Sequence, residues 1–241
     1  IEEEKALPSK PAREESREVY FKEVAEQYGL DVEHKESGYV DYKREPLIPQ
    51  MFSKRGPDME VADLNGDGLE DFVLSSGAGT GAPVVMTQNA NGSFSKLSGP
   101  WDSEVATEQT AIHLFDANND GKTDIYLGNG SNEFPDVTDA RYADKLYLLD
   151  GAGVAEAKLP NISTNTDSVA SADMDGDGDE DLFIAGGVNP GNYPLASPSY
   201  VFRNDGGSFT DVTKEWMPAA EGLGILNEAR FANVAGDETP E

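Results

Sequence analysis

The sequence contains no cysteine, and this absence removes several classes of site. Without thiols the chain can have no disulfide framework, no thiolate nucleophile and no zinc–thiolate centre. Histidine is nearly as scarce, since His34 and His113 are the only two. Neither lies in a zinc-protease motif, and no nucleophile elbow is present, so the sequence predicts no catalytic residue.

Positive charge is also scarce, because 18 lysines and arginines face 46 aspartates and glutamates, for a net charge of -28. Nucleic acids and anionic membranes bind basic surfaces, so neither is an expected partner. The short basic stretches YKRE (42–45) and SKR (53–55) are interpreted as solvated loops. No apolar run approaches the ~20 residues of a membrane span, so no direct membrane insertion is expected. Strong acidity instead favours bound cations or an extracellular setting.

Three aspartate-rich loops recur along the chain at nearly constant spacing. They are DLNGDGLED, DANNDGKTD and DMDGDGDED, at residues 63–71, 116–124 and 173–181. Their first aspartates are 53 and 57 residues apart. A period of this size is typical of stacked or radially arranged structural repeats.

Each of these aspartate loops lies between short runs of β-forming residues. MEVA, IHLF and VASA precede the loops, and FVLSS, IYLGN and LFIAGG follow them. A third β-rich run ends in a turn of Asn, Asp and Gly, and a fourth run such as SFSKL or SFTDV then begins. The pattern predicts an all-β fold made of β-propeller blades. Each blade has four antiparallel strands, with the aspartate loop in its first hairpin.

The domain boundaries follow from this pattern. Residues 1–17 are polar and lack apolar periodicity, which predicts a disordered or linker tail, and residues 18–241 form the expected propeller segment. Gly29 is expected to end a short N-terminal element. Phe21 and Val24 match the spacing of a fourth strand, which suggests the last strand of a preceding blade.

A degraded fourth loop is expected at residues 233–241, where Ala235 and Glu238 depart from the pattern. The expected architecture is therefore a partial propeller of about three blades plus flanking pieces. Such an arc would leave blade faces exposed, so we expect the chain to be part of a longer protein.

The chemistry of the loops predicts three Ca²⁺ sites. Ca²⁺ takes roughly 6–8 oxygen ligands, and positions one, three, five and nine of each loop carry Asp or Asn. The backbone carbonyl of position seven completes each set, and glycine at position six permits the tight turn. The third loop offers four charged ligands against three in the others, so we expect it to bind most tightly. The predicted ligands are Asp63, Asn65, Asp67, Leu69 and Asp71; Asp116, Asn118, Asp120, Lys122 and Asp124; and Asp173, Asp175, Asp177, Asp179 and Asp181.

Other interpretations of these motifs fail in the sequence itself. An EF-hand needs Glu at position twelve, where the three loops have Leu74, Leu127 and Ile184 inside apparent strands. GAGTGA (77–82) fits a dinucleotide-binding fingerprint, but Pro83 and a strand follow it instead of a helix. Mg²⁺ fits the loops less well than Ca²⁺ because it demands strict octahedral geometry.

The loops and the blade pattern resemble FG-GAP/VCBS repeats, the Ca²⁺-binding propeller repeats also found in integrin α-chains. KREPLIPQ, GPDMEVADLNGDGLEDF, GGVNPGNYP and YVFRNDGGSFTDVT are more closely similar to bacterial VCBS-repeat proteins related to cartilage acidic protein and the ASPIC/UnbV group. The resemblance covers roughly residues 18–241. It implies a propeller of the seven-bladed type, secreted or on the cell surface, with structural Ca²⁺.

Together these features predict a Ca²⁺-binding β-propeller scaffold that binds an unknown protein or carbohydrate and is not an enzyme. The expected location is extracellular, on the cell surface or periplasmic. Two alternatives stay open: the propeller portion of a polysaccharide-acting hydrolase or lyase with a site at the central channel, or a structural spacer beside another domain. Trp101 and Trp216 are expected to pack in the core or at its rim rather than stack on sugars.

Overall fold

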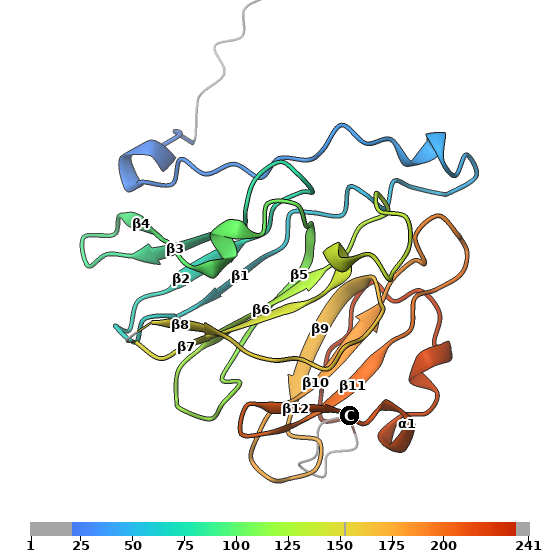
Figure 1. Ribbon diagram of the computed structural model, residues 1–241. Helices are drawn as coiled ribbons and strands as arrows, with labels where there is room; N and C mark the ends of the chain where they lie inside the picture. Colours follow the sequence, from blue (N-terminus) through green and yellow to red (C-terminus); the bar gives the residue numbers. More distant parts are fainter. Residues whose placement is uncertain (1–20, 152, 235–241) are drawn as a thin grey trace, which may run out of the picture.

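The computed structural model describes residues 21–151 and 153–234, and most of its regular structure is β-strand. Three separate four-stranded sheets are present, all antiparallel, and within each sheet the strands follow chain order (Figure 1). This order is expected when each strand pairs with the next through a short connection. The prediction of an all-β fold built from four-stranded antiparallel blades is confirmed, and the blades do not close into a ring.

The sheets are named blades 1 to 3. Blade 1 comprises β1 (Met59–Ala62), β2 (Asp71–Leu74), β3 (Val84–Gln88) and β4 (Phe94–Leu97). Blade 2 comprises β5 (Gln109–Phe115), β6 (Asp124–Asn129), β7 (Lys145–Leu149) and β8 (Val154–Glu156). Blade 3 comprises β9 (Thr166–Ala172), β10 (Asp181–Gly186), β11 (Tyr200–Asp205) and β12 (Ser208–Asp211). The helical turns are short: η1 (Ala25–Tyr28), η2 (Asp41–Lys43), η3 (Pro100–Ser103), η4 (Ala140–Tyr142), α1 (Thr213–Trp216) and η5 (Ala220–Gly222).

The first strands of the three blades lie side by side, β1 beside β5 and β5 beside β9. The pairing register places the three aspartate loops in the same phase. In every blade the residue before the loop pairs with the ninth residue of the loop, as in Ala62 with Asp71, and Phe115 with Asp124. The loops are therefore equivalent hairpin turns, as the repeat predicts.

Apolar clusters fill the two seams between blades. Between blades 1 and 2, Val73 and Val85 pack with Ile125 and Tyr147 around Trp101, which is fully buried and meets Tyr147 edge-on. The prediction that Trp101 packs in the core is confirmed. Between blades 2 and 3 the cluster includes Tyr126, Leu146, Leu182, Ile184 and Phe202.

The two outer faces of the arc differ. Residues 213–231 cover the outer face of blade 3, where Trp216 and Phe231 pack at the rim of a cluster around Phe183. On blade 1, Met59 and Val61 of β1 are 55% and 51% exposed. The described chain therefore covers the end of the arc at blade 3 more fully than the end at blade 1.

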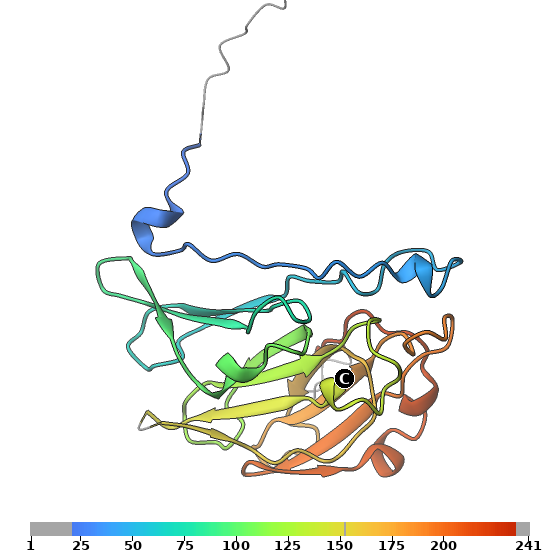
Figure 2. The same ribbon diagram turned by 45° about the horizontal axis from the view of Figure 1, so that its top comes forward.

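Residues 30–57, named the strap, run along the blade ends opposite the aspartate loops (Figure 2). Gly29 precedes the strap with a φ of 73° and ends η1, as predicted. Residues 21–24 form no strand and Phe21 is 91% exposed, so the assignment of this segment as a blade strand is wrong. The predicted tail, 1–17, lies outside the described residues, as does the degraded loop from residue 235 onward.

Candidate metal sites and the central cleft

In all three aspartate loops the first aspartate accepts the N–H groups of positions five and six. The first and third loops add a bond from position four. In the first loop, Asp63 Oδ1 accepts the N–H of Gly66 at 2.7 Å, and Asp63 Oδ2 accepts that of Gly68 at 2.8 Å. Asp173 makes the equivalent bonds in the third loop. The N–H of Gly68 is the main cause that holds the pKa of Asp63 below its usual value. The first aspartate of each loop thus curls the backbone around its own side chain.

The turn needs left-handed backbone at positions four and six. Gly66 and Gly68 have φ values of 78° and 82°, and the third loop has glycine at the same two positions. The second loop has Asn119 at position four, with a φ of 56°. Asparagine is among the few residues with a side chain that adopt this conformation readily. The second loop therefore keeps the same turn while gaining an amide group.

The third loop gathers its carboxylates most tightly. Asp173, Asp175 and Asp177 each place an oxygen within 4.8 Å of the others. A set of oxygen donors with this charge suits a hard divalent cation such as Ca²⁺. In the first and second loops the third position is Asn65 or Asn118, whose side-chain oxygen accepts the N–H of the fifth position.

The ninth aspartate of each loop has a structural role. These aspartates, Asp71, Asp124 and Asp181, are fully buried. Each accepts one N–H from position two of its own loop and one from the third strand of its blade, such as Leu149 N at 2.7 Å from Asp124. Asp181 is not part of the close group of three carboxylates in its loop. A ligand role for the ninth position remains a prediction.

Burial raises the pKa of all three ninth-position aspartates, and that of Asp124 reaches about 6. Backbone N–H donors oppose this shift, while the neighbouring aspartates of each loop add to it. The charged loop is therefore disfavoured by its own like charges. A bound cation would relieve that repulsion.

The second loop contains a lysine whose positive charge would compete with a bound metal ion. Lys122, at position seven, places Nζ 3.8 Å from Asp120 and donates to the carbonyl of Asp150. Its positive charge offsets one carboxylate beside the predicted site. This side chain favours weaker metal binding in the second loop than in the other two.

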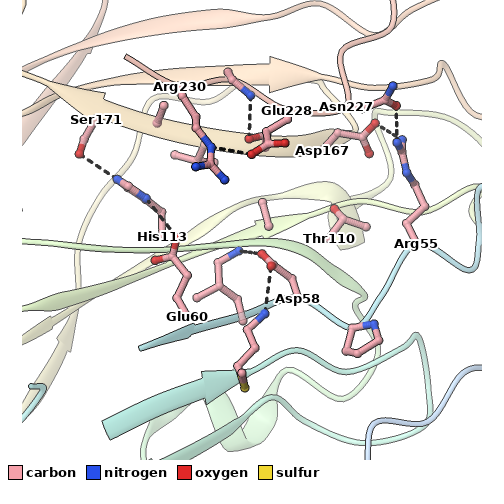
Figure 3. Close-up of a pocket in the computed structure, with 18 of the residues that line it drawn as sticks. Arg55, Asp58, Glu60, Thr110, His113, Asp167, Ser171, Asn227, Glu228 and Arg230 are labelled. Atoms are coloured by element: carbon pink, nitrogen blue, oxygen red, sulfur yellow. Dashed lines mark hydrogen bonds and ion pairs between the residues drawn. The ribbon is translucent and has the colours of Figure 1, made fainter. Parts of the chain in front are cut away.

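A cleft of about 670 Å³ lies where the first strands of the blades meet residues 227–231 (Figure 3). Its wall includes the open edge of β5. The N–H of Ile112 donates to Asp58 at 2.7 Å, and the N–H of Leu114 donates to Glu60 at 2.7 Å. Blade 1 thus satisfies backbone donors that the edge of blade 2 would otherwise leave unpaired.

The interpretation of SKR as a solvated loop is wrong, whereas YKRE is exposed at residues 42–44 but is anchored through Arg44. Arg55 of SKR is largely buried in the cleft and pairs with Asp167 and Asn227 (Figure 3). Burial raises the pKa of Asp167 to about 7 even though Arg55 acts to lower it. Arg44 of YKRE donates to backbone carbonyls in two different blades, including Phe134 O at 2.8 Å.

His113 links three blades without forming a catalytic triad. Its Nε2 lies 2.8 Å from Ser171 Oγ, and its Nδ1 lies 3.7 Å from Glu60 (Figure 3). The Ser171 hydroxyl donates to Glu180 at 2.5 Å, so its proton points away from the imidazole. A nucleophile needs its proton directed at the base, and the base needs a hydrogen-bonded orienting group.

Most charged groups of the cleft pair with one another or with backbone. Besides the contacts above, Arg230 Nε lies 2.6 Å from Glu228, and Ser168 accepts the N–H of Ala229 at 3.2 Å. A site that awaits a charged ligand leaves polar groups pointing into it. The cleft is better explained as the polar seam that joins the first strands.

The sequence signal for these cleft residues is their position alone, counted back from the start of each aspartate loop. The side chains three residues before the loop starts are Glu60, His113, Ala170 and Arg230. Those five residues before are Asp58, Ala111, Ser168 and Glu228. These positions lie in the first strands or their continuation and differ between blades, so the repeat carries no common motif there.

Residues 63–127 match the FG-GAP-like repeat family. The match covers roughly a quarter of the chain, from the first aspartate loop through β6. No curated protein matches the chain. In the described ranges, no helix has the combination of length and apolar character needed to cross a bilayer.

Proposed function

We propose that this chain is a Ca²⁺-loaded propeller segment that acts outside the cytoplasm as a non-catalytic scaffold for binding a protein or a glycan. The observation that carries the proposal is one loop geometry that recurs three times at the same end of the blades. The similarity of residues 63–127 to FG-GAP-like repeats supports the same conclusion. The paired charges of the central cleft favour a scaffold over an enzyme.

The residues that would hold the ions are those at positions one, three, five, seven and nine. The ion would supply positive charge that neutralises the crowded carboxylates and fixes each hairpin. We expect the third loop to bind most tightly because it has the most charged ligands, and the second most weakly because of Lys122. The degraded fourth loop is not included in the proposal.

Calorimetric titration with Ca²⁺ tests the metal sites. We expect three bound ions and a large fall in melting temperature when a chelator removes them. At a free concentration of one hundred times Kd, each ion stabilises the folded state by ~2.7 kcal/mol. Asp173→Asn should remove one ion, whereas Asp31→Asn, at an exposed position outside the loops, should leave three. Melting that is unaffected by chelator would contradict the proposal.

The scaffold role needs a separate measurement. The Ca²⁺-loaded chain should bind members of a glycan or surface-protein panel without turnover, and binding should weaken when chelator loosens the loops. Cleavage of a polysaccharide by the Ca²⁺-loaded chain would show that the alternative of an enzyme is correct.

A further inference from the structure

We propose that the second and third aspartate loops bind Ca²⁺ as a cooperative pair, while the first loop binds independently. The inference rests on the proposed Ca²⁺ function and adds a coupling between two of its sites. Two side-chain bridges join these two loops across the seam between blades 2 and 3.

The first bridge is the buried side chain of Asn204 in β11, which is 1% exposed. Its Nδ2 donates to Ala117 O at 2.9 Å and to Glu180 O at 3.1 Å. Ala117 is position two of the second loop, and Glu180 is position eight of the third. The side-chain oxygen of Asn204 accepts the N–H of Gly207 at 2.8 Å, so the amide is held in one orientation.

The second bridge uses an asparagine at position four of one loop and an aspartate at position seven of the next. The first loop has neither side chain at these positions. Asn119 Nδ2, at position four of the second loop, donates to Asp179 Oδ1 at 3.1 Å. Asp179 Oδ2 also accepts the N–H of Gly206 at 2.7 Å. Asp179 is position seven of the third loop, and its backbone carbonyl is a predicted ligand. The bridge therefore holds a ligand residue of the third site against the turn of the second.

The seam between the first and second loops is built differently. At the position equivalent to Asn204, blade 2 has Leu149. Its backbone N–H donates to the aspartate at position nine of the blade's loop, as that of Asn204 does in blade 3. Leu149 and Leu64 belong to one apolar cluster, and position four of the first loop is Gly66. Among the hydrogen bonds of the described residues, none joins the first loop to the second.

The coupling follows from the shared side chains. An ion that orders the third loop fixes Asp179 and the Glu180 carbonyl, and these then hold Asn119 and Ala117 of the second loop. The second ion consequently orders fewer free groups, so it binds more tightly. By linkage the second ion strengthens the third site by the same factor. Hydrogen bonds of this kind correspond to a coupling of about three- to tenfold in Kd.

The main experiment titrates Ca²⁺ into the whole chain and follows backbone amide signals of each loop by NMR. Asp173→Asn, which removes the ion of the third site, should raise the Kd of the second site by about three- to tenfold and leave the first site unchanged. Asp63→Asn in the first loop is the matched comparison and should leave the Kd of the second and third sites unchanged.

Two further variants test the bridges themselves. Asn119→Gly copies position four of the other loops, keeps the left-handed turn and removes one bridge, so it should reduce the coupling. The matched control, Gly66→Asn, adds the same side chain to the first loop and should create no coupling. Asn204→Leu copies blade 2 and should reduce the coupling further. Asn119→Gly answers the question even if Asn204→Leu does not fold.

The outcomes separate the inference from the function on which it rests. Loops that bind Ca²⁺ while Asp173→Asn leaves the second site unchanged would overturn the coupling and leave the proposed function intact. Coupling of equal size between the first and second loops would also overturn it. Absence of Ca²⁺ binding in every loop would overturn the proposed function as well.

Discussion

The two ends of the blades differ in the exposure of their carboxylates. The first five positions of each aspartate loop hold partly or fully exposed carboxylates, whereas Asp41 and Glu108 at the strap end are buried. Asp41 accepts hydrogen bonds from Ser53 and Asn132. Nearby, Glu36 lies 2.9 Å from His34 and 3.9 Å from Lys54. Apart from Glu108, the strap end thus pairs these carboxylates with the chain's own side chains.

The aspartate-loop end uses another solution. Its carboxylates accept backbone N–H groups, and among the described residues Lys122 is the lysine paired with a loop carboxylate. The strap end therefore pairs most of its carboxylates internally, whereas the loop end keeps exposed carboxylates that bound cations would neutralise under the proposed function. Three substitutions test this contrast, beginning with the largest expected effect.

Glu108→Gln should have the largest effect on stability at the strap end. Glu108 is the exception to the pairing of carboxylates there. The carboxylate oxygens of Glu108 are buried, and among the described residues no hydrogen bond of good geometry reaches them, although Ser131 lies close enough to act on the carboxylate. Burial, with Glu36 and Glu133 nearby, raises the pKa of Glu108 to about 9, and Ser131 and Lys54 oppose this only in part. The unfolded chain loses this proton near the ordinary glutamate pKa of 4.5, so folding stability falls as pH rises from about 4.5 to about 9.

We therefore expect Glu108→Gln to raise the free energy of unfolding by about 3 kcal/mol at pH 7 and to leave it nearly unchanged at pH 4.5. Urea denaturation of both proteins at several pH values measures this slope. Glu26→Gln, at an exposed position, is the control and should keep the parent slope. An equal gain at both pH values would mean that ionisation of Glu108 is not the cause.

Arg44→Met should weaken the strap end by a smaller amount. The guanidinium holds the strap to carbonyls after β6 and to Pro190 O, at 3.2 Å, after β10. Loss of charged hydrogen bonds at this partly exposed site should lower the free energy of unfolding by about 2 kcal/mol. Hydrogen exchange should show faster exchange in the strap and no change in the aspartate loops. Lys43→Met is the exposed neighbouring control, and an equal loss in both variants would argue against a specific role for Arg44.

Gly121→Ala should have the smallest effect and should act at the other end. Gly121 has a φ of 81°, with nothing within 4 Å of an added methyl group, so only backbone strain opposes alanine. We expect a loss of about 1 kcal/mol and weaker Ca²⁺ binding in the second loop, read by thermal melting with and without chelator. Gly38 of the strap has open space and an ordinary φ, so Gly38→Ala should cost nothing. A larger loss at Gly38 than at Gly121 would contradict the strain argument.

The aspartate-loop end could be predicted from the sequence because its determinants are local and repeated. The turn depends on side chains and glycines within nine residues, so each loop carries its own information, and three copies in phase identify the blade. The spacing also predicts the register, since Ala62 and Asp71 pair as expected for a hairpin. The sequence could not show that the ninth aspartates bond to the third strand, because that contact depends on the folded sheet.

The strap end and the cleft could not be predicted in the same way. Arg44 and Arg55 look like solvated charges in the sequence, but their partners, Phe134 and Asp167, lie 90 and 112 residues away. These contacts occur once in the described chain and carry no period. Their detection requires the arrangement of the blades, which local propensity does not supply.

The strap also gives the molecule a direction of mechanical strength. It crosses the ends of the blades, and Arg44 ties it to both blade 2 and blade 3. A pull on residue 30 would load these contacts together in shear, whereas a pull at blade 3 from the C-terminal side would peel residues 213–231 off one face. We expect a higher unfolding force for the first direction in single-molecule pulling. The same chain would then be a stiff tether from one end and a compliant one from the other.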